Sequence, residues 1–315
     1  MYYSIRHVTR FRYSAPISAS IMEVRMQPRS EGGQRCVSFS LQTSPRAKVM
    51  AYRDDIGNFV HHFDVPGRHG QLTITAQALV EMRPAAQLPT ALDGDAWGYL
   101  DALTANGEYY DYLAPSPRTQ PGPALAGLAR ELGLERGSDP LTLLRTLNTA
   151  IYQHFDYAPQ STDVNSPIDE AIASGRGVCQ DFTHIMLALL REVGVPCRYV
   201  SGYLFHRTDT GDRSSVDSTH AWVDAFLPGL GWVGFDPTND LVAGERHIRA
   251  ATGRDYGDVP PTRGVFKGKA ETELSVAVKV APSEAPPPED DVPRIIGWVA
   301  APADATTEDQ DQQQQ

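Results

Sequence analysis

Three residues in the second half of the chain, Cys179, His220 and Asp236, have the types and the order that covalent catalysis by a thiol requires. A thiol becomes a good nucleophile as the thiolate, and an imidazole oriented by a carboxylate can take its proton. Cys179 follows a Gly-Arg-Gly-Val run and precedes an apolar stripe of period three to four, so we expect it to open a buried helix. The first turn of a helix stabilises negative charge, which suits a nucleophile, and a core cysteine at the start of the helix is the alternative.

His220 and Asp236 are predicted to meet across a hairpin. The residues 219–227 and 232–235 read as neighbouring strands joined by a Pro-Gly-Leu-Gly turn. Asp236 directly follows the second strand and His220 lies at the start of the first, so antiparallel pairing can bring them together. Sequence separations of 41 and 16 residues are not enforced by local structure, so the three-residue site is a hypothesis about the fold.

The surrounding elements predict an α+β protein. Residues 1–85 alternate between apolar and polar side chains with Gly and Pro turns, which is typical of an antiparallel β-sandwich domain. Residues 86–123 are rich in Pro and Gly and are interpreted as a connector, in which residues 97–103 are expected to form a short helix. We expect residues 124–280 to form the catalytic domain, in which the nucleophile helix packs on an antiparallel sheet. The Pro- and Gln-rich tail, residues 281–315, is expected to be disordered.

Charge and cysteine content exclude several classes of protein. The 39 acidic and 28 basic residues give a net charge of −11. The tail holds eight of the acidic residues and only one arginine, and no cluster of Lys and Arg elsewhere forms a basic patch for nucleic acid. The first twenty residues lack the continuous apolar stretch of a signal peptide, and no apolar run reaches membrane-spanning length, so we expect a cytoplasmic protein without a membrane partner. The three cysteines have no CxxC spacing, which argues against a thiolate metal site or a disulfide framework.

Four segments resemble the transglutaminase-like superfamily, a papain-related group of cysteine enzymes. They are residues 175–182 (GRGVCQDF), 194–203 (GVPCRYVSGY), 219–223 (THAWV) and 232–239 (WVGFDPTN). The front half also resembles the N-terminal domain of a bacterial subgroup, and residues 253–261 (GRDYGDVPP) resemble a stretch that follows its core. The resemblance implies that Cys179 is the nucleophile, His220 the base and Asp236 the orienting carboxylate.

Further site residues are less constrained by the pattern. Asp181 matches a family position in the first turn after Cys179, although an acid there also suits the helix dipole. Trp222 shares the strand face of His220 and is expected to shield the imidazole from water or to serve as core. Some family members use an upstream tryptophan as second oxyanion donor, but no tryptophan lies between Trp97 and Cys179. Tyr157 is therefore the candidate donor, with the glutamines Gln160 and Gln180 as alternatives.

The expected reaction is attack of the Cys179 thiolate on an amide carbonyl to give a thioester. Water would resolve the thioester as in a peptidase or amidase, and an amine acceptor would resolve it as in a transglutaminase. The expected partner is a peptide or protein substrate, and neither a cofactor nor a metal is implied, since no EF-hand-like loop is present. An arylamine-type acyltransferase, which would turn over small acyl thioesters, and a non-catalytic binding module that retains the fold are the alternatives.

Overall fold

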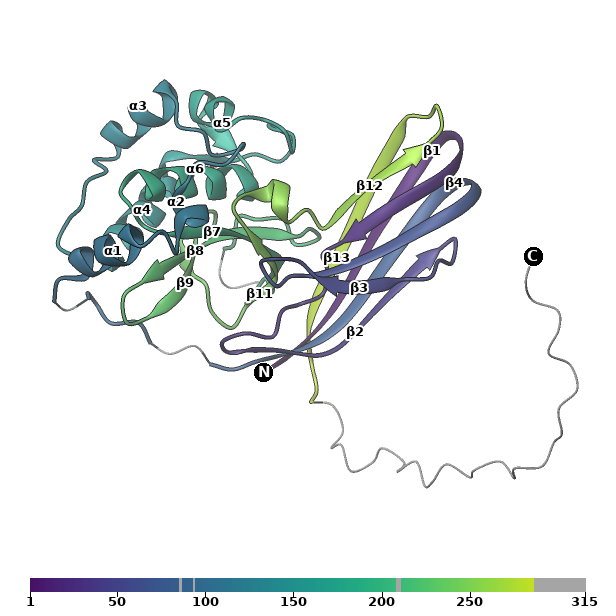
Figure 1. Ribbon diagram of the computed structural model, residues 1–315, viewed down its shortest axis with the longest axis horizontal. Helices are drawn as coiled ribbons and strands as arrows, with labels where there is room; N and C mark the ends of the chain where they lie inside the picture. The colour runs from purple at the N-terminus through teal and green to yellow at the C-terminus, as the bar shows by residue number, and fades with distance from the viewer. Residues whose placement is uncertain (85–86, 93, 208–210, 286–315) are drawn as a thin grey trace, which may run out of the picture. The chain divides into compact units, whose positions relative to one another are not determined.

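The first and the last strands of the described chain share one six-stranded antiparallel sheet, drawn in purple, blue and yellow-green in Figure 1. The computed structural model describes residues 1–84, 87–92, 94–207 and 211–285. The order of this sheet is β12-β1-β4-β2, with β13 also paired to β1 and β3 to β4. Its strands are β1 (Tyr2–Val24), β2 (Gln34–Ser44), β3 (Met50–Arg53), β4 (Phe59–Met82), β12 (Thr262–Lys267) and β13 (Thr272–Ser283).

The long strands β1 and β4 run through both halves of a folded sheet. The pairing of β1 with β4 shifts register between Arg12 and Ile17 and again before Ala19, where the strands bend. Apolar side chains from both halves pack in one cluster that includes Met22, Phe63, Leu72 and Ile74. The predicted antiparallel β-sandwich is therefore formed by one sheet that folds back on itself.

Two strands of this sheet lie outside the expected N-terminal domain. The predicted catalytic domain, residues 124–280, contained the segments that form β12 and β13, but both pair with β1. Their alternation fits a β domain at either end of the chain, so the sequence pattern could not assign them. The expected tail, residues 281–315, begins three residues before β13 ends, and its part from 286 onward lies outside the described residues.

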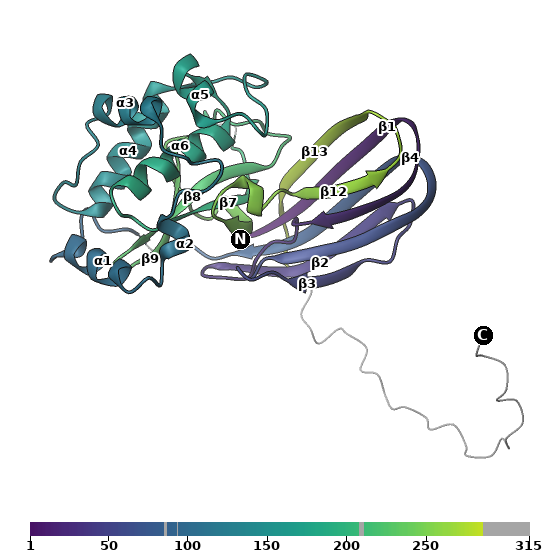
Figure 2. The same cartoon turned by 45° about the horizontal axis from the view of Figure 1, so that its top comes forward.

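The second sheet has five antiparallel strands in the order β10-β9-β8-β7-β11. Helix α6 packs on β7 and β8, and Figure 2 shows α3, α4 and α5 gathered around α6. None of the helices in the described part of the chain combines the length and apolar character needed to cross a membrane. The strands of this sheet are β7 (Cys197–Leu204), β8 (His220–Leu227), β9 (Gly231–Asp236), β10 (Leu241–Val242) and β11 (His247–Gly253). The helices are α1 (Ala96–Ala105), α2 (Tyr110–Leu113), α3 (Pro123–Glu131), α4 (Pro140–His154), α5 (Ile168–Ser174) and α6 (Cys179–Glu192).

The predicted core elements are confirmed, and the connector is more ordered than its composition suggested. The helix that starts at Cys179 and the three strands that follow it agree with α6, β7, β8 and β9 to within two residues. The segment 86–123 contains α1 and α2, and Leu100 of α1 is buried in the main apolar core. The short helix expected over 97–103 is confirmed by α1, which Asp95 caps by accepting a hydrogen bond from the Gly98 N–H.

The two sheets are joined along β11. The Asn58 side chain exchanges two hydrogen bonds with the backbone of Thr252, at 2.9 and 2.8 Å. The Gln34 side chain binds the backbone of Arg249 in the same way, with both distances 2.8 Å. Ile248 is buried in an apolar cluster with Tyr3, Val80 and Tyr203. The N-terminal sheet therefore fixes the position of a strand that belongs to the second sheet.

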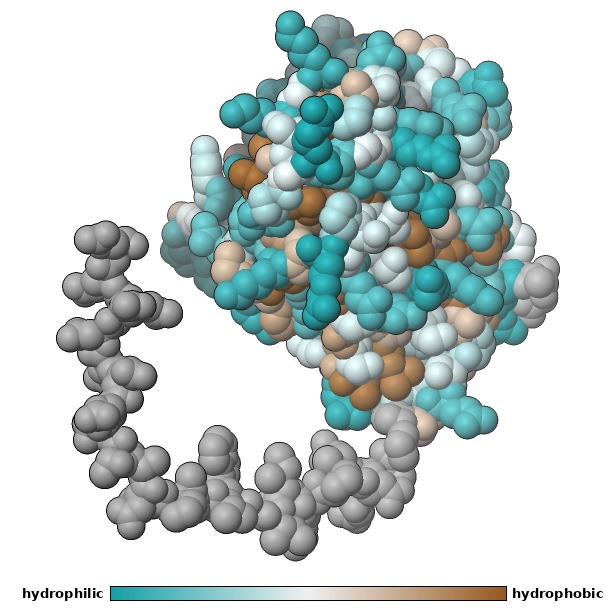
Figure 3. Space-filling view, turned by 90° about the vertical axis from the view of Figure 1, so that its right-hand side faces the viewer, coloured by the Kyte–Doolittle hydropathy of each residue, from teal (hydrophilic) through white to brown (hydrophobic). Residues whose placement is uncertain are grey.

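The side of the molecule that carries the N-terminal sheet faces the viewer in Figure 3, and its apolar patches are separated by polar residues. The strands β12 and β13 carry four exposed apolar residues, Val265, Phe266, Leu274 and Val276. Such scattered apolar groups are ordinary on a protein surface. The functional residues are therefore sought in the second sheet and its helices.

Gly202 is the position where the second sheet tolerates no side chain. It pairs with His220 across β7 and β8, and a Cβ there would overlap the Ile248 carbonyl oxygen and the Trp222 ring. We predict that Gly202→Ala lowers the free energy of unfolding by about 1–3 kcal/mol, because β11 and Trp222 cannot move aside. Urea denaturation measures this loss.

The matched control is Gly127→Ala in α3, where the added Cβ meets no heavy atom within 4 Å. This change should stabilise the protein by about 0.5–1 kcal/mol, since alanine is the better helix former. If Gly202→Ala unfolds at the same urea concentration as the wild type, the close approach of β7, β11 and Trp222 is wrong.

Candidate active site

Cys179 is the first residue of α6 and is half-buried. The chain reaches it through Gly175, which has a left-handed φ of 65°, and through the two-residue strand β6 (Arg176–Gly177), which pairs with β5 (Asp156–Tyr157). A Cβ at Gly177 would lie 2.9 Å from a carboxylate oxygen of Asp181, so glycine permits the close approach of the helix. The predicted tight bend before the cysteine is confirmed.

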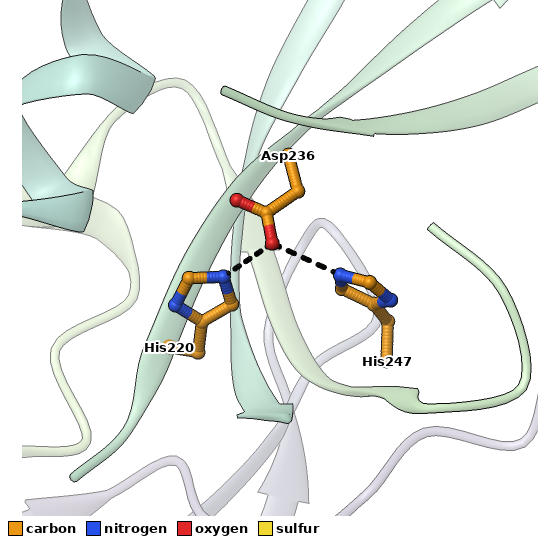
Figure 4. A group of neighbouring side chains, drawn as sticks. All are labelled: His220, Asp236 and His247. Atoms are coloured by element: carbon orange, nitrogen blue, oxygen red, sulfur yellow. Dashed lines mark hydrogen bonds and ion pairs between the residues drawn. The ribbon is translucent and has the colours of Figure 1, made fainter. Parts of the chain in front are cut away.

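His220 and Asp236 meet at the ends of neighbouring strands, as the hairpin predicted. His220 begins β8, Asp236 ends β9, and His220 Nε2 lies 2.7 Å from Asp236 Oδ2 (Figure 4). Both side chains are buried, with His220 3% and Asp236 0% exposed. A buried carboxylate this close to an imidazole orients the ring and favours its protonated form.

The other nitrogen of His220 is the one available to Cys179. Nδ1 is buried and makes no hydrogen bond of normal geometry within the described part of the chain. Burial by itself lowers the pKa of His220, but the charge and hydrogen bond of Asp236, with a smaller contribution from the Cys179 thiol, raise it to about 10. The imidazole is therefore charged at neutral pH when the thiol beside it has given up its proton.

Asp236 accepts five hydrogen bonds. Its Oδ2 receives His220 Nε2 at 2.7 Å, Asn239 Nδ2 at 2.9 Å and His247 Nε2 at 3.1 Å. Its Oδ1 receives the backbone N–H groups of Thr238 at 3.0 Å and Asn239 at 3.3 Å. Burial favours the neutral acid, yet His220 and His247 hold the pKa of Asp236 well below its usual range. The carboxylate therefore stays ionised.

His247, at the start of β11, is a site residue that the sequence analysis missed. Its Nδ1 accepts a hydrogen bond from the Gly244 N–H at 3.3 Å, so the proton is assigned to Nε2, which donates to Asp236. Burial lowers the pKa of His247 more than Asp236 raises it, so the ring is neutral. No periodicity or motif marked this residue, because it reaches the site through pairing of β11 with β7.

His220, Asp236 and His247 also form a group of metal-ligand types whose ligand atoms lie within 4.8 Å of one another. Two histidines and a carboxylate could coordinate a divalent transition metal. In this structure the two Nε2–H groups both donate to the same carboxylate oxygen, and the carboxylate receives three further donors. Hydrogen bonding therefore accounts for the arrangement without a metal.

Tyr157 and Gln180 lie near the nucleophile and form hydrogen bonds with different loops. The Tyr157 hydroxyl accepts the Ser215 N–H at 3.2 Å, and burial, followed by the charge of Cys179, raises its pKa. The hydroxyl acts as acceptor in this bond, so its hydrogen remains available to donate. Gln180 donates its amide to the Val164 carbonyl at 3.3 Å and so holds the preceding loop. Of these two oxyanion candidates, Tyr157 is the better placed.

Asp181 and Trp222 are buried residues that hold other residues of the site in place. Asp181 is buried and accepts the Val178 N–H at 2.8 Å and the Thr162 hydroxyl at 2.6 Å, which ties the start of α6 to the preceding loop. Trp222 is fully buried, with its ring centre 6.0 Å from that of His220 and 5.2 Å from that of His247. Asp181 therefore positions the helix, and Trp222 backs the imidazoles.

Comparison with known proteins identifies both parts of the chain. Residues 3–81 match the bacterial transglutaminase-like N-terminal region, and residues 127–237 match the transglutaminase-like superfamily. An uncharacterized protein of Mycobacterium leprae is 32% identical over 275 residues, which cover 87% of this chain and 96% of the relative. An uncharacterized protein of Mycobacterium tuberculosis is 33% identical over 309 residues, covering 90% of this chain and 93% of the relative.

Two further matches cover very different shares of this chain. A protein-glutamine gamma-glutamyltransferase of Pseudomonas aeruginosa is 31% identical over 112 residues, which are 32% of this chain and 17% of that protein. The crystal structure of a candidate cysteine protease from Cytophaga hutchinsonii superimposes with a TM-score of 0.67, covering 91% of this chain and 93% of that one at 21% identity. The second likeness shows a shared fold.

The hydrogen bond that His247 donates to Asp236 can be tested separately from the protonation of the His247 ring. In His247→Gln the amide nitrogen can still reach Asp236, whereas His247→Leu removes the donor. We predict that the leucine variant is less stable than the glutamine variant by about 1.5–3 kcal/mol, the usual value of a hydrogen bond to a charged group. Equal stability of the two variants in urea would contradict the role of this donor.

Both variants should also change the pH dependence of stability. Burial lowers the pKa of His247, so below about pH 6.5 the unfolded chain binds a proton that the folded chain does not bind. The stability of the wild type therefore decreases as the pH is lowered. The two variants lack the imidazole that binds this proton in the unfolded chain. The stability advantage of the wild type should therefore shrink between pH 7.5 and pH 5.5, by up to about 1.4 kcal/mol per pH unit. An unchanged difference would show that His247 is not held neutral.

Proposed function

Because this chain belongs to the transglutaminase-like superfamily, as the sequence motifs predicted, we propose that it is a cysteine-nucleophile enzyme that acts on amide bonds through a thioester. The observation that carries the proposal is the position of the His220 imidazole between the buried Asp236 carboxylate and the Cys179 thiol. The substrate is a peptide or protein. The expected cytoplasmic location and the expected lack of nucleic-acid and membrane partners stay predictions.

The proposed reaction begins with proton transfer from Cys179 to Nδ1 of His220. The thiolate attacks the amide carbonyl carbon, and the carbonyl oxygen becomes an oxyanion that the Cys179 N–H and the Tyr157 hydroxyl stabilise. His220 then gives its proton to the leaving nitrogen, the C–N bond breaks and a thioester remains. Asp236 stays ionised throughout and holds the ring, as its low pKa and five donors require.

The fate of the thioester depends on whether water or an amine reaches it. The loop before β8 contacts the site at two points: the Asn239 amide oxygen accepts the N–H groups of Arg213 and Ser214, and Tyr157 accepts that of Ser215. A loop held this way favours controlled access of the second substrate. We propose peptidase or amidase activity, with transfer to an amine as the alternative outcome of the same intermediate.

The experiment that tests the nucleophile is mass spectrometry of the intact protein after exposure to a peptide library and acid quenching. The wild type should carry acyl adducts on Cys179, and Cys179→Ala should carry none and lose turnover by about 10³-fold or more. Cys36→Ala is the matched control, because Cys36 lies in β2 of the N-terminal sheet and burial raises its pKa to about 11. Unchanged turnover in Cys179→Ala would refute the proposal.

The same assay separates the alternatives. An adduct that is consumed by water gives a hydrolase, and one consumed by an added primary amine gives a transferase. Adducts from small acyl thioesters, but none from peptides, would favour an arylamine-type acyltransferase. A Cys179 that accepts no acyl group from either donor would indicate a binding module that retains the fold.

The Asp236 charge should set the alkaline limit of the reaction. Asp236→Asn removes the charge that raises the pKa of His220, so the imidazole loses its proton at a lower pH and can no longer protonate the leaving group. We predict that the alkaline limb of turnover moves to lower pH and that kcat falls by about 10²–10⁴-fold. Measurement of kcat between pH 5 and pH 10 checks both.

The matched control for this prediction is Asp240→Asn. Asp240 lies four residues further on and accepts hydrogen bonds from Asn148 and Thr149 of α4 instead of from His220. An asparagine can still accept these bonds, so the pH profile should stay unchanged. If both variants shift the profile equally, the effect does not come from the His220 partner.

A further inference from the structure

The part of the chain that the structure describes contains a cavity of about 400 Å³ whose lining includes none of the candidate active-site residues. Its walls come from three segments far apart in the sequence: the turn before α3, the loop before α5, and the segment around the short 3-10 helix η1 (Tyr256–Asp258). Four of its nine lining residues are charged, which is unusual for a cavity that serves only packing. They are Arg118, Arg254, Asp255 and Asp258.

Three of these four charges are already matched within the wall. Arg254 binds Asp258 with both of its forked donors, at 2.9 and 3.0 Å. Asp255 is buried, and its two oxygens accept the backbone N–H groups of Arg118 at 3.1 Å and Gly257 at 2.7 Å. Each oxygen of Asp255 therefore already accepts a hydrogen bond, and the Arg254–Asp258 pair has no net charge.

Arg118 is the cation of the wall that pairs with no carboxylate in the described part of the chain. Its guanidinium donates to two neutral acceptors, the Val164 carbonyl and the Asn165 side-chain oxygen, the latter at 3.1 Å. Its central carbon lies 5.7 Å from the ring centre of Tyr256. No carboxylate lies within ion-pair distance of it among residues 1–84, 87–92, 94–207 and 211–285. Two acceptors and an aromatic face hold the group in place, so it is oriented before a ligand arrives.

The cavity is connected to the nucleophile through two residues. Gln180, next to Cys179, donates to the same Val164 carbonyl that Arg118 binds. Tyr256 lies next to Arg118, and both Arg118 and Cys179 affect its pKa. Burial raises this pKa, Arg118 lowers it, and the charge of Cys179 raises it further. Val164 and Tyr256, which adjoin lining residues in the sequence, are therefore each linked to the first turn of α6.

We propose that this cavity is a subsite that binds a carboxylate of the substrate, with Arg118 as the residue that recognises it. The inference rests on the proposed function, since it assigns the subsite to the substrate that Cys179 attacks. A guanidinium with unused N–H groups suits a carboxylate, which can accept two of them. The carboxylate belongs either to an acidic side chain or to the free C-terminus of a peptide near the reacting amide.

The test compares the rates at which two maleimides alkylate Cys179. One is 6-maleimidohexanoic acid, and the other is the matched neutral amide, 6-maleimidohexanamide; intact mass and peptide mapping follow the reaction. If Arg118 binds the carboxylate, the acid reacts about tenfold faster than the amide and its rate saturates with concentration. Equal rates for the acid and the amide would overturn the subsite.

Three variants show whether the preference comes from Arg118. Arg118→Gln should abolish the tenfold preference, and Arg118→Lys, which keeps the charge, should retain most of it. Arg176→Gln is the control, because Arg176 is exposed and three residues from Cys179 but does not line the cavity. A preference that survives in Arg118→Gln, or that disappears in Arg176→Gln, would mean that general charge attraction explains the rates.

The same data keep the two proposals apart. The rate of the neutral maleimide at Cys179 relative to Cys36 tests the activated nucleophile, whereas the ratio of acid to amide at Cys179 tests the subsite. Two peptide pools then identify the source of the carboxylate: one has free C-termini and no acidic residues, and the other is amidated and contains Asp and Glu. Acyl-adduct formation should fall about tenfold in Arg118→Gln for one pool, and no fall for either would contradict the proposal.

Discussion

The ionised carboxylate of Asp236, fully buried at the end of β9, is the charge on which the site depends. Burying a carboxylate is costly unless donors surround it, and five donors from four residues do so here. Each donor comes from an element that the fold must place correctly: β8 for His220, β11 for His247 and the turn after β9 for Asn239. The geometry of three strands is therefore determined by one negative charge.

The N-terminal sheet contributes to this geometry although it supplies no proposed reacting group. It binds β11 through Asn58 and Gln34, and β11 begins with His247. A second buried carboxylate, Asp224 of β8, binds Arg249 of β11 at 3.0 Å. The segment before β8 is held as well, because the Val278 N–H of β13 donates to the Asp217 carbonyl. Strands from both ends of the chain thus fix the frame in which His220 is oriented.

The sequence predicted the parts of the site that adjoin recognisable local structure. Cys179 follows a glycine-rich bend and opens an amphipathic helix, while His220 and Asp236 flank a hairpin turn, and all three were located from these signals. His247 was not found, because its approach depends on the register of β11 against β7, and strand register between distant segments leaves no periodic trace. Arg118 was missed because the cavity that it lines is built from three segments far apart in the sequence.

The fold was predicted to a similar extent. Alternation identified strands of the N-terminal sheet, and helical spacing identified α6, because those patterns arise from one buried face. Alternation does not say which sheet a strand joins, so β12 and β13 were assigned to the wrong domain. In the segment 86–123, the short helix expected over 97–103 is confirmed by α1, whereas α2 was taken for part of a connector.

Exposure divides the site into a fixed half and a variable half. His220, Asp236 and Trp222 are buried among strands, so the imidazole has one protonatable nitrogen left to share with the sulfur. Cys179 is half-buried, and its neighbours Tyr157 and Gln180 bind backbone groups of two loops, at Ser215 and at Val164. In the proposed reaction, the strands therefore hold the imidazole that activates the sulfur, whereas the loops control which acyl group enters and what removes it. Proteins that share these strands can thus differ in substrate and in reaction without any change in the buried residues.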